Sequence, residues 1–359
     1  MTSPFLKSSN RAGEGAINLS VLPPSTPVLQ TLSFQYPLKL IAPSPIDLAN
    51  NDSPLEGTAN SVLTSSIVHS VFVLTYGGGL LPGDHISLRV NLASGTRLIL
   101  LTQGSTKIFK TNPSAANHVN ASQVSAMSSQ RMIIHVEDDA ALCYLPDPVQ
   151  PFANSAFEQK QIYKMLGAGK GSICVCDWVC EGRRARGENW SFERYTSCNE
   201  IWTYRRHDPV RKLQDLDRLM LRDNVILDGR DSNDTATSTK TNNTGVFGTL
   251  MLRGPLFKAL GQYFLDEFRL LPRIGAKQWD TDHKGGDHEQ DGPEDERAVR
   301  QGQEVEDDLL WTAAASRGNV IVKFGARSVD GARSWLRSML VSEGTIQREF
   351  GERALLCLR

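Results

Sequence analysis

The sequence has few aromatic residues, no long apolar run and no dominant sign of charge. Aromatics make up 7% of the 359 residues, and 39 Lys and Arg face 40 Asp and Glu, a net charge of −1. No overall field therefore attracts nucleic acid or an anionic membrane. No run approaches the roughly 20 apolar residues of a membrane helix, and the first residues lack the apolar core of a secretory signal. We expect a cytoplasmic protein that binds neither nucleic acid nor membrane.

The six cysteines are expected to be reduced thiols, because nothing indicates export to an oxidising compartment. Cys174, Cys176 and Cys180 have the spacing C-x-C-x-x-x-C. This spacing lacks the C-x-x-C knuckle of a tetrahedral zinc site. Buried thiols on one face of a strand are favoured, because free cysteine packs as a compact apolar residue. The sequence leaves their role open.

Most of the chain has the pattern of β-strands. In HISLRVNL, Ile86, Leu88, Val90 and Leu92 alternate with polar residues, which predicts a strand with one buried face. Gly and Pro interrupt such runs repeatedly. Only two segments have helical spacing, at 255–270 and near 329–341. We therefore predict a mainly β fold of layered, β-helix-like sheets with about two α-helices.

The predicted organisation is one domain, over residues 16–359, after a disordered tail at residues 1–15. Two stretches are predicted to be low-complexity insertions. Residues 229–245 are rich in Ser, Thr and Asn, and residues 280–307 are acidic and nearly free of large apolar side chains. Such segments bury too little apolar surface to offset their ordering entropy.

The stretch TYGGGLLPGD, residues 75–84, invites comparison with a phosphate-binding loop. Gly78 and Gly83 have the G-x-x-x-x-G spacing, but Asp84 and His85 stand where Lys and Ser or Thr should follow. A carboxylate at that position would repel a nucleotide. The residues favour a tight β-connection, in which glycines allow positive φ and Pro82-Gly83 makes a turn. This interpretation does not explain Asp84.

Four motifs in this order resemble the urease accessory protein family UreD, also called UreH, of the kind found in fungi. They are GGGLLPGD, TQGSTKIF, LPDPVQPF and GRRARGE. The resemblance spans roughly residues 12–359 apart from the two insertions. The motif positions that it assigns to structure are Gly77, Gly78, Gly79, Gly83, Pro146, Pro148, Gly182, Arg183 and Gly187.

The resemblance implies a non-catalytic role. Members of this family are scaffolds that join UreF and the GTPase UreG, dock on apo-urease and help to insert nickel. The implied partners are therefore UreF-like and UreG-like proteins and apo-urease. No permanently bound cofactor is implied, and nickel(II) would be in transit through a polar tunnel.

Asp84 and Glu188 match acidic positions of the family motifs and are the candidate nickel contacts. Each also has a structural explanation, because Asp84 could cap a turn and Glu188 could pair with a neighbouring arginine such as Arg183. An alternative function is a β-solenoid-like carbohydrate-active enzyme with Asp84 and Glu188 as the acid–base pair. The scarcity of aromatic side chains disfavours it, since sugar clefts commonly use aromatic platforms.

Overall fold

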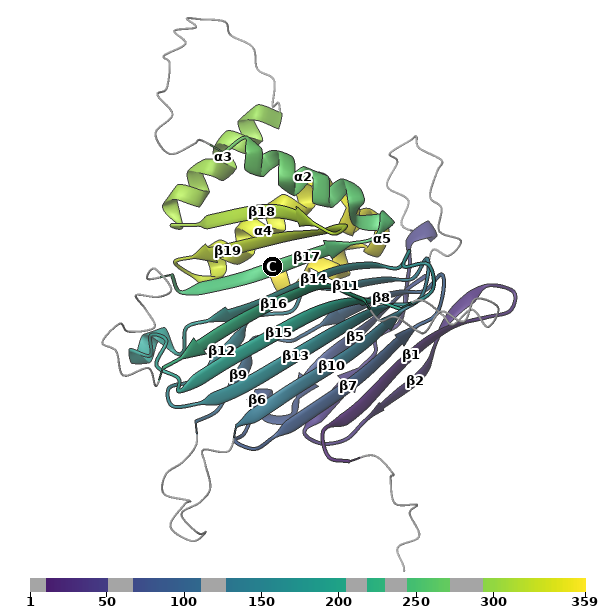
Figure 1. Ribbon diagram of the computed structural model, residues 1–359, viewed down its shortest axis with the longest axis horizontal. Coiled ribbons are helices and arrows are strands. Elements are labelled where there is room, and N and C mark those ends of the chain that lie inside the picture. Colours follow the sequence, from purple (N-terminus) through teal and green to yellow (C-terminus); the bar gives the residue numbers. More distant parts are fainter. Residues whose placement is uncertain (1–10, 51–66, 111–126, 205–217, 230–243, 272–292) are drawn as a thin grey trace, which may run out of the picture.

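The computed structural model describes residues 11–50, 67–110, 127–204, 218–229, 244–271 and 293–359. Two β-sheets lie against each other, and helices cover one end of the second sheet (Figure 1). The predicted mainly β, layered architecture is confirmed. Residues 1–10 of the predicted tail and residues 230–243 and 280–292 of the predicted insertions lie outside the described residues.

The first sheet has seven strands. Their order is β16 (Arg218–Asp228), β15 (Arg194–Thr203), β13 (Ala156–Met165), β10 (Ser128–Val136), β7 (His85–Leu92), β1 (Glu14–Leu22) and β2 (Thr26–Phe34). Each neighbouring pair in the series β1, β7, β10, β13 and β15 is parallel. The outermost strands β2 and β16 run antiparallel to their neighbours β1 and β15.

The second sheet has twelve strands. Its main order is β18 (Leu310–Ser316), β19 (Asn319–Ala326), β17 (Val246–Arg253), β14 (Ser172–Cys180), β11 (Ala141–Tyr144), β8 (Arg97–Leu101), β5 (Ile67–Thr75) and β3 (Leu38–Ile41). Four short strands join it at the side: β4 (Ile46–Asp47), β6 (Gly79–Leu80), β9 (Thr106–Ile108) and β12 (Val149–Pro151).

The chain passes back and forth between the sheets, which gives the β-helix-like character. Strands β7, β10 and β13 of the first sheet are each followed in the sequence by β8, β11 and β14 of the second. Neighbouring strands within each series are parallel. Alternate residues of each strand therefore face the space between the sheets.

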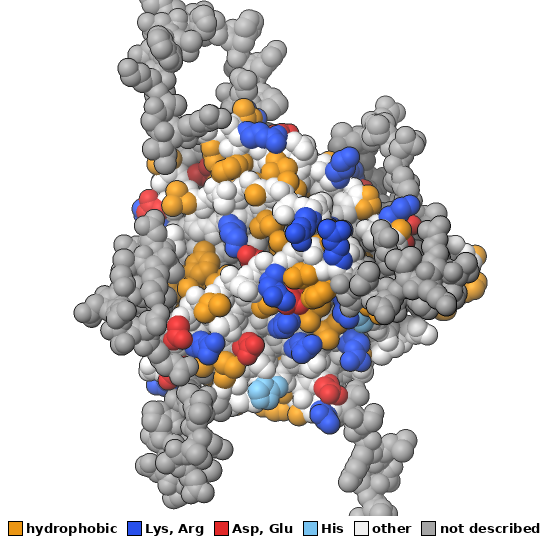
Figure 2. Space-filling model, viewed as in Figure 1, with side chains coloured by type: hydrophobic (Ala, Val, Ile, Leu, Met, Phe, Trp, Pro, Cys, Tyr) orange, Lys and Arg blue, Asp and Glu red, His pale blue; other side chains and the backbone are white. Residues whose placement is uncertain are grey.

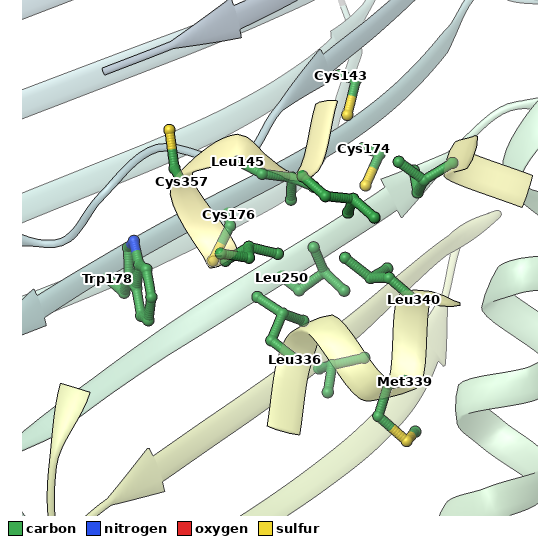
Figure 3. Packing of buried hydrophobic residues seen from close by; sticks show 14 of the residues in the cluster. Cys143, Leu145, Cys174, Cys176, Trp178, Leu250, Leu336, Met339, Leu340 and Cys357 are labelled. Carbon is green, nitrogen blue, oxygen red and sulfur yellow. The ribbon is translucent and has the colours of Figure 1, made fainter. Parts of the chain in front are cut away.

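Side chains from both sheets fill most of that space. Leu88 and Ile134 from the first sheet pack with Leu98, Leu142 and Val175 from the second, all within 1% of full burial. The opposite face of the second sheet packs under the helices. Its four cysteines Cys143, Cys174, Cys176 and Cys180 belong to a second apolar cluster with Leu250, Leu336 and Leu340, and Figure 3 shows part of this cluster.

The helices match two predicted segments and add others. They are α2 (Lys258–Arg269), α3 (Pro293–Glu306), α4 (Val329–Glu343) and α5 (Thr345–Phe350), with short 3₁₀ turns η1 (Leu48–Asn50), η2 (Tyr76–Gly78), η4 (Arg184–Arg186), η5 (Pro255–Phe257) and η6 (Glu352–Leu358). Helix α4 begins after Ser328, whose hydroxyl accepts a hydrogen bond from the Gly331 amide at 3.1 Å. None of the helices in the described ranges is long and apolar enough to cross a membrane.

Helix α3 lies within residues 280–307, where the sequence predicts an insertion. Its Arg300 is 6% exposed and bonds Glu267 of α2 at 2.5 Å and Glu304 at 3.3 Å. Glu304 in turn accepts a hydrogen bond from the indole of Trp335 in α4 at 2.9 Å. Buried ion pairs thus fix this helix to the fold where apolar contacts are few, and a search for apolar periodicity misses such a helix.

Candidate functional site

A group of polar side chains interrupts the apolar packing between the sheets. On β13, Phe157 and Tyr163 face inward with the core, while Gln159 and Gln161 occupy the same face between them. On β15, Ser197 and Asn199 lie beside them, in register with Gln159 and Gln161. We call the whole group the polar cluster: Thr102, Gln130, Asp147, Gln159, Gln161, Asp177, Ser197, Asn199, Asp223 and Thr249, each no more than 9% exposed.

Asp177 lies at the centre of the polar cluster. It is the one charged residue of β14, whose nine residues are all buried. One carboxylate oxygen accepts a hydrogen bond from Gln159 at 2.8 Å, and the other accepts from Ser197 at 2.5 Å and Asn199 at 2.6 Å. Three donors converge on this group because adjacent strands place their inward-facing residues side by side.

Burial raises the pKa of the Asp177 carboxyl, and the nearby Asp223 raises it further, against the lowering effect of the three hydrogen bonds. Asp223 on β16 is held by Lys323 at 2.5 Å and by the Thr249 hydroxyl at 3.0 Å. Thr249 and Lys323 also line an open hollow of about 540 Å³ at the side of the molecule, formed by β16, β17, β18 and β19. Asp223, next to this hollow, and Asp177, deeper between the sheets, therefore form a series of carboxylates that leads toward the interior.

Asp147 lies on the other side of Asp177. A cavity of about 20 Å³ is lined by both aspartates together with Gln130, Gln159 and Gln161. A cavity of this size holds about one water molecule. Asp147 accepts hydrogen bonds from the Thr102 hydroxyl and the Gly104 amide, both at 2.9 Å, and pairs with Arg333 of α4 at 3.0 Å.

The polar cluster thus connects three carboxylates through the middle of the β-structure, from the hollow beside Asp223 through Asp177 to Asp147. Asn199 adds a buried side-chain oxygen with no hydrogen-bond partner among the described atoms. Carboxylate, amide and hydroxyl oxygens of this kind suit a hydrated divalent cation. In the described part of the chain, no three His, Cys, Asp or Glu side chains converge as a metal site would require.

The two candidate nickel contacts lie in turns elsewhere. Asp84 lies between β6 and β7, where its carboxylate accepts a hydrogen bond from the Leu81 amide at 2.8 Å. Glu188 follows η4 and accepts from the Arg183 amide at 3.0 Å, the Arg183 guanidinium and the Ala153 amide at 3.3 Å. Within the described residues neither carboxylate bonds to the other or to Asp177.

These contacts stabilise the ionised form of Glu188. Hydrogen bonds from the Arg183 side chain, more than any other cause, lower the pKa of Glu188 to about 2. The guanidinium of Arg183 also lies over the ring of Phe152, 4.1 Å from its centroid. The GRRARGE motif is therefore fastened to the end of the LPDPVQPF motif, which brings two distant sequence motifs together.

The remaining motif positions have structural roles at the small cavity and in the glycine turn. The Pro146 carbonyl accepts a hydrogen bond from the Trp178 indole at 2.7 Å, and Pro146 lines the cavity between Asp147 and Asp177. Gly77 and Gly78 have φ values of +78° and +74°, so the predicted positive φ in the glycine motif is confirmed. Gly79 allows close approach, because a Cβ there would lie 2.3 Å from the Lys107 carbonyl oxygen.

Asp147, Asp177 and Asp223 were not among the residues that the sequence singled out. One signal was available, since Asp177 is the only charge in the run SICVCDWVC. Asp147 stands between the two motif prolines, which draw attention to the backbone and not to the carboxylate. Asp223 has no comparable local signal, and only the pairing of β15 with β16 brings it to the cluster.

Two stacked sheets whose apolar core contains one buried polar cluster define a layered β-protein, and comparison with known proteins identifies its family. The model of the UreD urease accessory proteins matches residues 13–355. The chain therefore belongs to the UreD family, as its motifs predict, and its role is in urease maturation.

Individual relatives agree with this assignment. The chain is 28% identical over 354 residues to urease accessory protein 4 of Cryptococcus neoformans var. grubii, covering 93% of this chain and 91% of the relative. It is 26% identical to an uncharacterized ureD-like urease accessory protein of Schizosaccharomyces pombe, covering 84% of each chain. Urease accessory protein D of Arabidopsis thaliana is 32% identical over 47% of this chain and 48% of its own length.

Proposed function

We propose that this protein is a non-catalytic chaperone and scaffold for the insertion of nickel into apo-urease. In this proposal it bridges apo-urease and a complex of UreF-like and UreG-like proteins in the cytoplasm, and nickel(II) is its cargo. The observation that carries the proposal is the line of buried carboxylates Asp223, Asp177 and Asp147 between the sheets. Membership of the UreD family supports the same role.

The chemistry of the polar cluster suits passage better than storage. Nickel(II) binds most firmly to sites rich in imidazole and thiolate, whereas single carboxylates and neutral oxygens bind it more weakly and release it. A cavity with room for about one water would let an ion exchange contacts stepwise between Asp177 and Asp147. Because burial raises the pKa of Asp177, an arriving cation would compete with a proton there.

The alternative enzymatic function has less support. A glycosidase needs one carboxyl group with a raised pKa as the general acid. Glu188 has the opposite property, a pKa of about 2 caused chiefly by Arg183, and Asp84 is engaged by the Leu81 amide. Nucleotide binding is assigned to the UreG-like partner, because Asp84 stands where a phosphate loop has lysine.

The test combines gene deletion with reconstitution. Deletion of the gene in a urease-positive host should leave folded urease without nickel, as measured by metal analysis of the purified enzyme. The variants Asp177→Asn and Asp223→Asn should lower activation most at limiting nickel while the complex still assembles. Asp139→Asn is the control, since that side chain is exposed in the turn between β10 and β11, where its φ of +61° also suits asparagine. Normal urease activity and nickel content after deletion would overturn the proposal.

A further inference from the structure

The outer face of the seven-stranded sheet carries a concentration of basic side chains. Figure 2 shows Lys and Arg gathered over the strands that Figure 1 places at the front. We call the outward-facing cations of β7, β10, β13 and β16 the basic face: Arg89, Arg131, Lys160, Lys164 and Arg222. The whole chain has a net charge of −1, so this concentration is a local feature.

Strand register brings these cations together. Arg131 is the direct neighbour of Lys160, and Arg89 is the neighbour of Ile133, which is next to Ile162. Strands about 4.8 Å apart and residues about 3.3 Å apart put the five cations within about 19 by 13 Å. That area would form the centre of an ordinary protein interface of roughly 800 Å² per partner.

Only part of this positive charge is neutralised within the molecule. Glu200 on β15 pairs with Lys160 at 3.2 Å and with Arg222 at 3.1 Å. For Arg89 and Arg131 the described residues supply no ion-pair partner, and Lys164 lies over the ring of Tyr204, 5.7 Å from its centroid. Burial, Lys164 and Arg89 together lower the pKa of the neighbouring His135, which reflects the positive surroundings.

We propose that the basic face is a docking surface for a protein partner that presents an acidic surface. Charge complementarity specifies this partner, because unpaired cations speed and orient association with an anionic patch. A protein fits better than nucleic acid for two reasons. The half-buried Ile133 lies between the cations and offers apolar contact. Glu200 already pairs with two of the five cations, which leaves few for the many phosphate contacts of a nucleic acid.

The experiment measures binding to three purified probes, and the choice of probes rests on the proposed function. The probes are apo-urease, the UreF-like protein and the UreG-like protein of the same organism, each tested alone and as a mixture. The test variant is Arg89→Glu with Arg131→Glu and Lys164→Glu. The matched control has the same change of charge and residue types elsewhere: Arg186→Glu, Arg269→Glu and Lys258→Glu, all exposed.

The test variant should bind one of the probes about tenfold more weakly or worse at low salt, mainly through slower association, and the control should not. High salt should reduce the difference. If wild type binds the probes and the test variant binds all of them as tightly as wild type does, the proposed docking surface is overturned while the proposed function stands. Binding of the basic face to a short duplex DNA would also overturn it. Failure of wild type to bind any probe would overturn both proposals.

Discussion

The turn at Glu188 offers a direct test of whether the acidic residue of the GRRARGE motif serves structure or contacts nickel. In Glu188→Gln the side chain keeps its size but loses its charge. The wild-type carboxylate accepts hydrogen bonds from the amides of Arg183 and Ala153 and from the Arg183 guanidinium. A glutamine must turn a donor toward one of these donors, so at least one bond is lost.

The magnitude follows from the pKa. A fall from 4.5 to about 2 corresponds to about 3 kcal/mol of stabilisation without screening. Arg183 is 29% exposed, so solvent screens the pair and we expect a cost of about 1–2 kcal/mol for Glu188→Gln at neutral pH. The folded-state pKa lies below the unfolded value. The stabilisation is therefore complete above pH 4.5 and is lost as pH falls toward 2.

Urea denaturation of both proteins at pH 7 and at about pH 3 checks this sign. The difference between wild type and Glu188→Gln should be largest at pH 7 and should shrink at the lower pH. Glu306→Gln, an exposed control on α3, should have little effect at either pH. Equal stability of wild type and Glu188→Gln at pH 7, with a loss of urease activation at limiting nickel, would refute the anchoring role and favour a nickel contact.

Three further predictions concern packing and reactivity. Gly79→Ala should lower the free energy of unfolding by on the order of 3 kcal/mol, because its Cβ would meet a backbone oxygen. Gly77→Ala, whose Cβ meets nothing within 4 Å, should lower it by about 1–2 kcal/mol through its positive φ alone. Equal shifts of the melting temperature in the two variants would contradict this prediction. Alkylation of the native protein followed by mass spectrometry should label Cys198 first, since burial raises the pKa of Cys176 well above its usual value; prior labelling of Cys176 would count against the packing. Arg300→Ala should destabilise the fold by about 3 kcal/mol because it leaves the buried Glu304 without a cation, while Glu267 keeps Arg297 at 2.8 Å. An unchanged denaturation midpoint would show that α3 is not held this way.

The sequence predicts those parts of the fold that depend on local periodicity. The alternation in residues 85–92 predicts β7, and helical spacing predicts α2 and α4. It does not predict α3, because the buried partners of Arg300 come from a different helix and from the next turn. Apolar patterns reveal burial only where burial is achieved by apolar side chains.

The polar cluster could not be predicted for a related reason. Gln159 is 18 residues from Asp177, and Asn199 is 22 residues from it. These sequence separations do not indicate that polar residues of β13 and β15 in one sheet converge on Asp177 of β14 in the other sheet. In the sequence of β13, Gln159 and Gln161 stand at inward positions. From the sequence alone this pattern is equally consistent with an irregular strand, because the facing residues of the other sheet are not known.

The energetics of Asp177 provide a test of whether this residue serves stability or the proposed nickel path. Burial raises its pKa above 3.8 even against three hydrogen bonds, so the ionised form is disfavoured in the folded protein. What Asp177 contributes to stability is therefore greatest at low pH and is lost as pH rises through the folded-state pKa. In stability measurements from pH 4 upward, Asp177→Asn should consequently gain on wild type as pH rises. Any buried carboxyl with a raised pKa shows this pH dependence. A gain in stability combined with weaker nickel transfer would therefore show that Asp177 serves the transfer of nickel and not the stability of the fold.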